Sequence, residues 1–173
     1  MKAMKNPVEV ENIKRAHIKD GVTMCKFIYW LKKNVPLGNV SEISAAEKLV
    51  EFRAQMDGFL DQSFAPIFGY GEHGAIIHYS ATEETNVVMK DKGLCLIDTG
   101  AHYYDGTTDV TRTVVLGELT KEEKEAFTIV LKGNLNLANT TFVYGTTGAD
   151  IDCVARRPLW EKGMDFNHGT GHG

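Results

Sequence analysis

Two aspartates in the middle of the chain, Asp98 and Asp109, are placed where carboxylates could do chemistry. Asp98 directly follows the apolar run 94–97, so its carboxylate is expected to be half-buried and to need a partner. Asp109 comes eleven residues later, beyond the turn signal Asp105-Gly106. A hairpin over 94–115 would bring the two carboxylates together, where they repel unless a cation lies between them or one takes up a proton.

This pair of carboxylates fits a two-metal hydrolytic site, in which a carboxylate bridges ions that lie about 3.5–4 Å apart. Two solvated turn residues would have the same spacing, and for an isolated pair that is the commoner case. The apolar run before Asp98 favours the metal site, because a half-buried carboxylate has to be compensated.

Histidines form a second group of candidates. His168 and His172 belong to the run His-Gly-Thr-Gly-His-Gly, where glycines let the backbone approach a ligand closely and imidazole is the commonest metal ligand. A flexible terminal loop would have the same composition. His78 lies in the segment 75–79, which predicts a strand, and a lone histidine in an apolar strand is more often a hydrogen-bonded core residue. The remaining histidines are assigned to the surface or to loops: His17, His73 and His102.

Two helices are predicted before these candidates. Asn6-Pro7 has the form of an N-cap followed by proline at the first helical position, and the apolar pattern predicts a helix to about Lys33. Pro36 and Gly38 should end it. Ser44-Ala-Ala-Glu47 has the form of a capping box and predicts the start of a second helix at Ser44.

The candidate residues themselves lie on predicted strands. Residues 75–79 and 94–98 are apolar runs, and the Thr- and Val-rich segment 107–115 predicts the second arm of a hairpin or bent strand pair. A capping box over 120–123 then predicts a long helix to about residue 138.

The order of elements predicts the fold class. A fourth helix through Ile151 and Val154 contains Pro158, which can kink it, and a strand or loop follows over 167–173. Helix–helix–strands followed by helix–helix–strand suggests two half-copies, the second unfinished. We expect an α/β (α+β) fold with helices on one side of a curved, mostly antiparallel sheet.

Composition excludes several classes of protein. The chain has 173 residues, about one domain, with 43% hydrophobic and 24% charged residues and a formal net charge of −4. This balance gives no reason to expect binding to nucleic acid or to an anionic membrane. The short basic clusters are expected at helix ends or in solvent: Lys32-Lys33 and Arg156-Arg157.

The cysteines and the N-terminus indicate a compartment. Cys25, Cys95 and Cys153 are odd in number and far apart, so neither a disulfide framework nor a thiolate zinc site is expected. No apolar stretch follows the N-terminal residues as in a signal peptide, and no run approaches the roughly 20 residues that span a bilayer. We therefore expect reduced thiols and a cytoplasmic location.

Taken together, the motifs resemble one enzyme family. Residues 96–113 (LIDTGAHYYDGTTDVTRT) are similar to the metal-binding hairpin of aminopeptidase P, an Xaa-Pro aminopeptidase of the pita-bread metallopeptidase superfamily. Residues 74–79 (GAIIHY) and 168–173 (HGTGHG) resemble the family's upstream and histidine segments, in the right order. Shorter matches lie at 42–46 (EISAA) and 158–160 (PLW).

The resemblance implies a role for each candidate residue. Asp98 would bind one metal ion, Asp109 would bridge two, and His172 would bind the other. His78 and His168 would be catalytic groups that contact substrate and stabilise charge in the transition state. The ions would be two divalent metals, with manganese favoured by an oxygen-rich ligand set with one imidazole, and cobalt or zinc possible.

The reaction implied is release of the N-terminal residue from peptides with proline at the second position, by attack of a metal-bridging hydroxide on the carbonyl before proline. Arg112 is expected to orient the site carboxylates. An Xaa-Pro dipeptidase (prolidase), which cleaves dipeptides only, is an alternative within the same chemistry. A non-catalytic pita-bread module that binds peptides or proteins is an alternative of another class.

The chain also departs from the family pattern. The family has two glutamate ligands and a further histidine after the last motif, and other domains before the catalytic one. Residues 1–173 are therefore expected to be a partial catalytic domain that is inactive alone. An open sheet edge would then favour poor solubility or a homo-oligomer, such as a dimer, that covers it.

Overall fold

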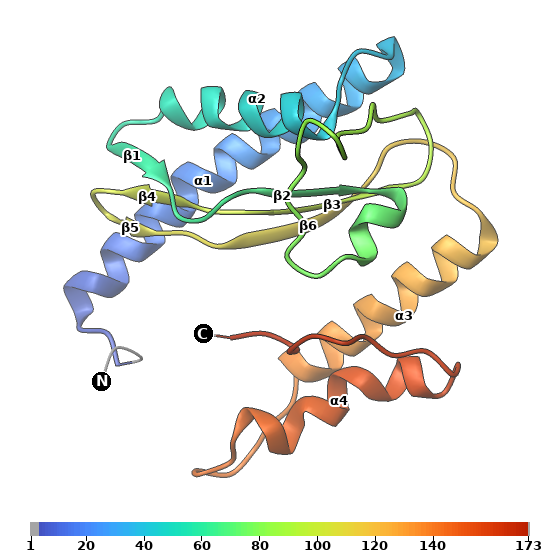
Figure 1. Ribbon diagram of the computed structural model, residues 1–173. Helices are drawn as coiled ribbons and strands as arrows, with labels where there is room; N and C mark the ends of the chain where they lie inside the picture. The colour runs from blue at the N-terminus through green and yellow to red at the C-terminus, as the bar shows by residue number, and fades with distance from the viewer. Residues whose placement is uncertain (1–3, 173) are drawn as a thin grey trace. The chain divides into compact units, whose positions relative to one another are not determined.

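The computed structural model describes residues 4–172, which fall into two compact units (Figure 1). The first unit runs to Leu119 and the second begins at Thr120. Each unit is described by itself. No helix in the part of the chain that the structure describes is long and apolar enough to cross a membrane.

Helix α1 (Pro7–Asn34) confirms the first sequence prediction. Asn6 caps it by accepting a hydrogen bond from the Glu9 backbone amide at 2.9 Å, and the Glu9 carboxylate accepts one from the Asn6 amide at 2.8 Å. The helix passes into the short 3₁₀ helix η1 (Val35–Leu37) and ends at Gly38, whose φ of 77° is a conformation that glycine adopts without strain.

Helix α2 (Glu42–Ala54) begins two residues before the predicted start at Ser44. Its N-cap is Ser41, not Ser44. The Ser41 amide donates to the Ser44 hydroxyl at 2.8 Å, and the Ser44 amide donates to the Ser41 hydroxyl at 3.2 Å. A serine at both capping positions forms the reciprocal bonds that the sequence analysis assigned to Ser44 and Glu47, and Glu47 is exposed.

The strands form two three-stranded antiparallel sheets. One sheet has the order β1-β4-β5, with β1 (Phe59–Gln62), β4 (Ala101–Tyr103) and β5 (Gly106–Thr107). The other has the order β2-β3-β6, with β2 (Ile67–Tyr70), β3 (Leu94–Thr99) and β6 (Val110–Val115). The predicted hairpin over 94–115 is confirmed, whereas β1 and β2 were not predicted.

The turn of the hairpin is displaced by one residue from the predicted position. Tyr103 pairs with Gly106, so Tyr104 and Asp105 form the turn. Asp105 is held against α1 by Lys19 and by Arg15, whose Nε lies 3.3 Å from its carboxylate. The hydrogen bond from Lys19 holds the pKa of Asp105 below its usual range. Long-range ion pairs therefore set the position of this turn.

The core of the first unit lies between the helices and the second sheet. Phe27 of α1 packs edge-on against Phe68 of β2, with ring centroids 5.7 Å apart. Leu49 of α2, Cys95 and Ile97 of β3 belong to the same buried cluster. Figure 1 shows α1 and α2 alongside the strands, as expected for helices that cover one face of an antiparallel sheet.

The second unit consists of two helices and the segment that follows them. Helix α3 (Lys121–Ala138) has the predicted capping box, because Thr120 and Glu123 bond each other's backbone amides at 3.1 and 2.7 Å. Helix α4 (Gly148–Trp160) packs on it, and Gly133 lies so close to the Ala155 carbonyl that a side chain there would clash. Residues 167–172 form bends and no strand.

Candidate metal and catalytic residues

Strand pairing places Asp98 and Asp109 on the same face of the hairpin. Asp98 pairs with Thr111 and Thr99 with Val110. Continued by one step, this register puts Asp109 opposite Gly100, and the Thr108 amide still donates to the Ala101 carbonyl at 2.8 Å. Diagonal neighbours of this kind are about 7–8 Å apart, within reach of a shared cation.

The surroundings of the two carboxylates differ. Asp98 is half-buried, as expected, and accepts a hydrogen bond from the Thr111 hydroxyl at 2.7 Å. Asp109 is exposed. Arg112, which was predicted to orient the carboxylates, pairs with Ile97, which puts it on the opposite face from Asp98, and its guanidinium donates to the Thr111 carbonyl at 2.7 Å.

A buried ion pair lies behind this part of the hairpin. Arg53 of α2 contacts Asp20 of α1 through two nitrogens, at 2.8 and 3.2 Å, and both side chains are fully buried. Arg53 also donates to the Thr99 hydroxyl at 3.0 Å and to the Gly100 carbonyl at 2.9 Å. The Thr108 hydroxyl donates to Asp20 at 2.8 Å. The sequence analysis missed this pair, because neither residue has a local signal.

His78 is not on a strand, contrary to the prediction for 75–79. Residues Gly71–Ala75 form the 3₁₀ helix η2, and a turn follows. His78 is exposed and has a positive φ of 56°, which is uncommon for a residue other than glycine. The apolar residues Ile76 and Ile77 are exposed as well, so these two residues of the predicted strand are not part of the core, whereas Tyr79 is buried.

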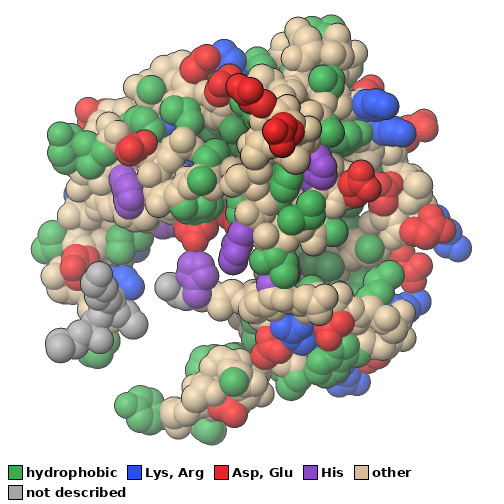
Figure 2. Space-filling model, in the orientation of Figure 1, with side chains coloured by type: hydrophobic (Ala, Val, Ile, Leu, Met, Phe, Trp, Pro, Cys, Tyr) green, Lys and Arg blue, Asp and Glu red, His purple; other side chains and the backbone are tan. Residues whose placement is uncertain are grey.

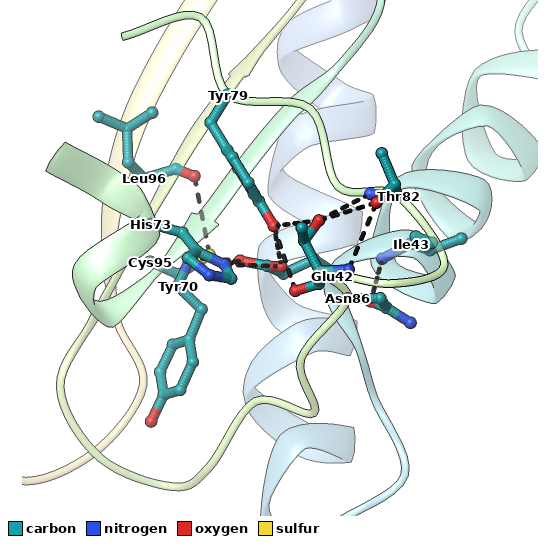
Figure 3. A network of polar contacts seen from close by, with 10 residues as sticks. Glu42, Ile43, Tyr70, His73, Tyr79, Thr82, Asn86, Cys95 and Leu96 are labelled. Carbon is teal, nitrogen blue, oxygen red and sulfur yellow. Dashed lines mark hydrogen bonds and ion pairs between the residues drawn. The ribbon is translucent and has the colours of Figure 1, made fainter. Parts of the chain in front are cut away.

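The segment that carries His78 is tied to the start of α2 by Glu42 (Figure 3). The Glu42 carboxylate is fully buried. It accepts hydrogen bonds from the Tyr70 amide at 2.9 Å and from the Tyr79 hydroxyl at 3.0 Å, and it lies 2.9 Å from Nδ1 of His73. His73 is thus a partly buried partner of Glu42, not the surface or loop residue that the sequence analysis assigned.

A second set of contacts fixes the far side of the same segment. The Tyr79 hydroxyl also lies 3.2 Å from that of Thr85. Asn86 accepts a hydrogen bond from the Ile43 amide at 3.2 Å (Figure 3). Burial raises the pKa of Tyr79, which keeps its hydroxyl protonated and able to donate to Glu42. The residue next to His78 is therefore held from two directions.

In the second unit, Arg156 ties the His168 segment to α4. Its guanidinium contacts Asp152 at 2.6 Å and Asp165 at 2.8 Å, and donates to the carbonyls of Phe166 at 2.6 Å and His168 at 2.9 Å. It also lies 4.0 Å from the centroid of the Phe166 ring. Arg156 was expected to be solvated or at a helix end, and it is instead the anchor of this segment.

The histidine segment contacts α4 a second time at Thr170. Thr170, between the two histidines, donates to the Asp152 carboxylate, and this bond is the main reason that the pKa of Asp152 is lowered. The His168 ring stacks on Phe166 with centroids 4.7 Å apart, and His172 is exposed. The roles of His168 and His172 stay predictions.

Comparisons with known proteins agree with these motifs. A family model described as metallopeptidase family M24 matches residues 11–173. The chain belongs to metallopeptidase family M24. The Xaa-Pro aminopeptidase ApepP of Drosophila melanogaster is 46% identical over 98% of this chain, and aminopeptidase P2 of Arabidopsis thaliana is 44% identical over 99%. The chain spans 28% and 24% of the lengths of these two relatives.

Solved structures of this family share the fold. A structure described as X-prolyl aminopeptidase from Caenorhabditis elegans, a cytosolic enzyme with a di-nuclear active site, is 40% identical over 99% of this chain with a TM-score of 0.92. The Xaa-Pro dipeptidase from Bacillus anthracis is 31% identical with a TM-score of 0.84. The chain covers 28% and 46% of these structures. The mixed helices and antiparallel strands thus form part of the pita-bread fold of family M24, which is a family of metal-dependent enzymes.

The carboxylate pair fits part of a metal site. Asp98 and Asp109 offer anionic oxygens on one face of the hairpin, and such donors suit hard divalent cations. Within residues 4–172, no three His, Cys, Asp or Glu side chains form a group that could hold a metal ion. The pair therefore needs further ligands, and His172 remains the predicted third.

Proposed function

We propose that this chain is the part of an Xaa-Pro aminopeptidase that carries Asp98, Asp109 and the histidines of its active site. The observation that supports this most directly is the shared face of Asp98 and Asp109, in a chain that resembles named Xaa-Pro aminopeptidases over almost all of its length. The reaction is hydrolysis of the bond between the first residue of a peptide and a proline at the second position.

Each residue has a proposed part in this reaction. Asp98, Asp109 and His172 would hold the divalent ions. The chemistry that such ions supply is activation of water and polarisation of the scissile carbonyl. His78 and His168 contact the substrate and stabilise negative charge on its carbonyl oxygen. Manganese is the proposed metal because carboxylates outnumber imidazoles.

Proline is a chemically sensible specificity determinant. An Xaa-Pro bond is a tertiary amide and its nitrogen carries no hydrogen, so a site that requires no hydrogen bond from that nitrogen accepts it. The aminopeptidase is preferred to the dipeptidase because the Drosophila aminopeptidase is 46% identical, against 31% for the Bacillus anthracis dipeptidase. Comparing Xaa-Pro with Xaa-Pro-Xaa peptides separates the two.

The proposal extends to the location and the partners of the protein. The Caenorhabditis elegans structure is described as a cytosolic enzyme, and all three cysteines of this chain are free, in keeping with a cytoplasmic protein. Figure 2 shows acidic and basic side chains mixed over the visible surface, which does not favour nucleic acid as a partner. A homodimer stays a proposal.

The test compares the 173-residue chain with a chimaera. In the chimaera, residues 6–173 replace the matching segment of the Caenorhabditis elegans aminopeptidase. The rest of that aminopeptidase supplies the remaining ligands that the resemblance implies. With Mn²⁺, we expect the chimaera to release the first residue of an Xaa-Pro-Xaa peptide. We expect the chain alone to be inactive, since it supplies only three of five expected ligands: Asp98, Asp109 and His172.

Two controls make the result decisive. An Asp109→Ala chimaera should be inactive and should have lost metal, because the substitution removes a ligand of both ions. Equal turnover by the chain alone and by the chimaera would show that no further ligands are required. A folded chimaera that binds Mn²⁺ but cleaves no Xaa-Pro peptide would contradict the proposed function.

A further inference from the structure

The buried ion pair Asp20–Arg53 contacts the residues that immediately adjoin both candidate metal ligands. Arg53 bonds Thr99, the residue after Asp98, at 3.0 Å. Asp20 accepts a bond from Thr108, the residue before Asp109, at 2.8 Å. The pair bridges the two arms of the hairpin directly behind the carboxylates.

Strand geometry explains why these contacts point away from the carboxylates. Successive side chains alternate between the two faces of a strand. Thr99 and Thr108 are buried on the face toward α1 and α2, and Asp98 and Asp109 therefore lie on the other face. A shift of either threonine would move the neighbouring carboxylate, because the two residues share a peptide unit.

The hairpin is also packed tightly at this point. The Gly100 carbonyl accepts bonds from Arg53 at 2.9 Å and from the Ser63 amide at 3.1 Å. A side chain on Gly100 would clash with the Ser63 hydroxyl and the Thr108 carbonyl. The Thr108 hydroxyl accepts a bond from the Ala101 amide at 3.0 Å while it donates to Asp20.

A purely stabilising role does not account for this pair. Two charges with no solvent exposure cost a large desolvation free energy, and apolar residues of similar volume often stabilise a fold as well or better. What an apolar pair could not supply is the set of directed bonds to Thr99, Gly100 and Thr108.

We propose that Asp20 and Arg53 are positioning residues that hold Asp98 and Asp109 at the separation required by two metal ions. The proposal rests on the proposed function. The two residues touch neither metal nor substrate, and they act through the backbone of 99–101 and through Thr108. Residues that orient metal ligands typically contribute about 10–100-fold to metal affinity or activity.

The test uses Thr108, because it can be changed without removing either buried charge. In the chimaera, Thr108→Val keeps the shape of the side chain and deletes its bonds to Asp20 and Ala101. Thr108→Ser keeps the hydroxyl. Thr107→Val is the matched control, because it makes the same chemical change on the adjacent residue. Thr107 is exposed, and its hydroxyl lies 2.8 Å from Nδ1 of His102.

The primary readout is Mn²⁺ affinity, measured from the free ion by electron paramagnetic resonance. We expect Thr108→Val to weaken binding about tenfold, and Thr108→Ser and Thr107→Val to bind like the parent. We also expect kcat of Thr108→Val to recover as Mn²⁺ is raised, with KM unchanged, because the substrate contacts are not altered.

The outcomes separate the two proposals. Equal Mn²⁺ affinity in Thr108→Val and Thr107→Val, in an active parent chimaera, would overturn the positioning role. The positioning role would also be overturned if the metal-free Thr108→Val protein lost thermal stability without a change in Mn²⁺ affinity. That result would show that the bond between Thr108 and Asp20 only stabilises the fold. A parent chimaera that binds Mn²⁺ without cleaving the peptide would instead count against the proposed function.

Discussion

Replacing Arg53 with methionine should destabilise the first unit strongly. The substitution leaves the fully buried carboxylate of Asp20 without its counter-charge and removes the donors to Thr99 and Gly100. Breaking a buried ion pair by removing one partner costs about 3–5 kcal/mol. Because the Thr108 hydroxyl still donates to Asp20 at 2.8 Å, we expect the lower part of this range, about 3–4 kcal/mol.

The double variant Asp20→Leu/Arg53→Met should be less damaging than the single one. It removes the uncompensated charge, and apolar replacement of a buried ion pair is often close to neutral. The hydroxyls of Thr99, Tyr103 and Thr108 and the Gly100 carbonyl still lose a partner, but Gly100 keeps its bond to Ser63 and Thr108 keeps its bond to Ala101. We therefore expect the double variant to be less destabilised than Arg53→Met.

Urea unfolding followed by tryptophan fluorescence measures these losses. Trp30 lies in α1 beside Phe27, with ring centroids 5.9 Å apart, so its emission reports the first unit. A Trp160→Phe background removes the signal of the second unit.

Two results would refute this reasoning. A loss below about 1 kcal/mol for Arg53→Met is what a solvated surface pair would give. A double variant whose loss equals the sum of the two single variants would show that Asp20 and Arg53 do not interact.

Three further predictions follow from single sites. Gly100→Ala should destabilise the chain, because a Cβ would clash with the backbone of Thr108. Gly21→Ala in α1, where a Cβ would meet open space, should stabilise the chain by up to about 1 kcal/mol. Thermal unfolding compares the two variants. In the chimaera, His78→Asn should lower turnover and keep metal content near that of the parent. Asparagine is chosen because it tolerates the positive φ of this residue. Metal loss as great as in Asp109→Ala would contradict the proposal that Asp109 binds metal and His78 contacts the substrate. Burial raises the pKa of Cys95 to about 12, so the stability from its neutral thiol is complete below about pH 8.5 and is lost as pH rises through 12. The urea concentration at the midpoint of unfolding should therefore fall less steeply in Cys95→Val than in the parent as the pH is raised above 9.

Helices and the hairpin could be read from the sequence because their signals are local. Asn6 and Thr120 cap their helices through bonds to residues three positions away, so the pattern and the structure coincide. The hairpin followed from apolar and β-branched residues on both sides of a turn. At α2 the N-cap is Ser41 and not the predicted Ser44, so that prediction was wrong by three residues.

The site was predicted in part. The apolar run and the turn signal singled out Asp98 and Asp109, and the register, continued by one step, puts them on one face. The segment around His78 was wrongly predicted to be a strand. An apolar run predicts burial, but Ile76 and Ile77 are exposed, and Tyr79 is the residue next to His78 that is buried. The assignments of His168 and His172 remain predictions.

The groups that hold these residues in place could not have been found from the sequence. Arg53 and Asp20 are 33 positions apart, and Glu42 and His73 are 31 apart, so nothing in the local pattern pairs them. The sequence by itself determined where α1 and α3 begin and which carboxylates and histidines are candidates, since those depend on neighbouring residues. Only the tertiary structure decided which charges are buried together, because burial of a charge depends on whether distant segments bring it a partner.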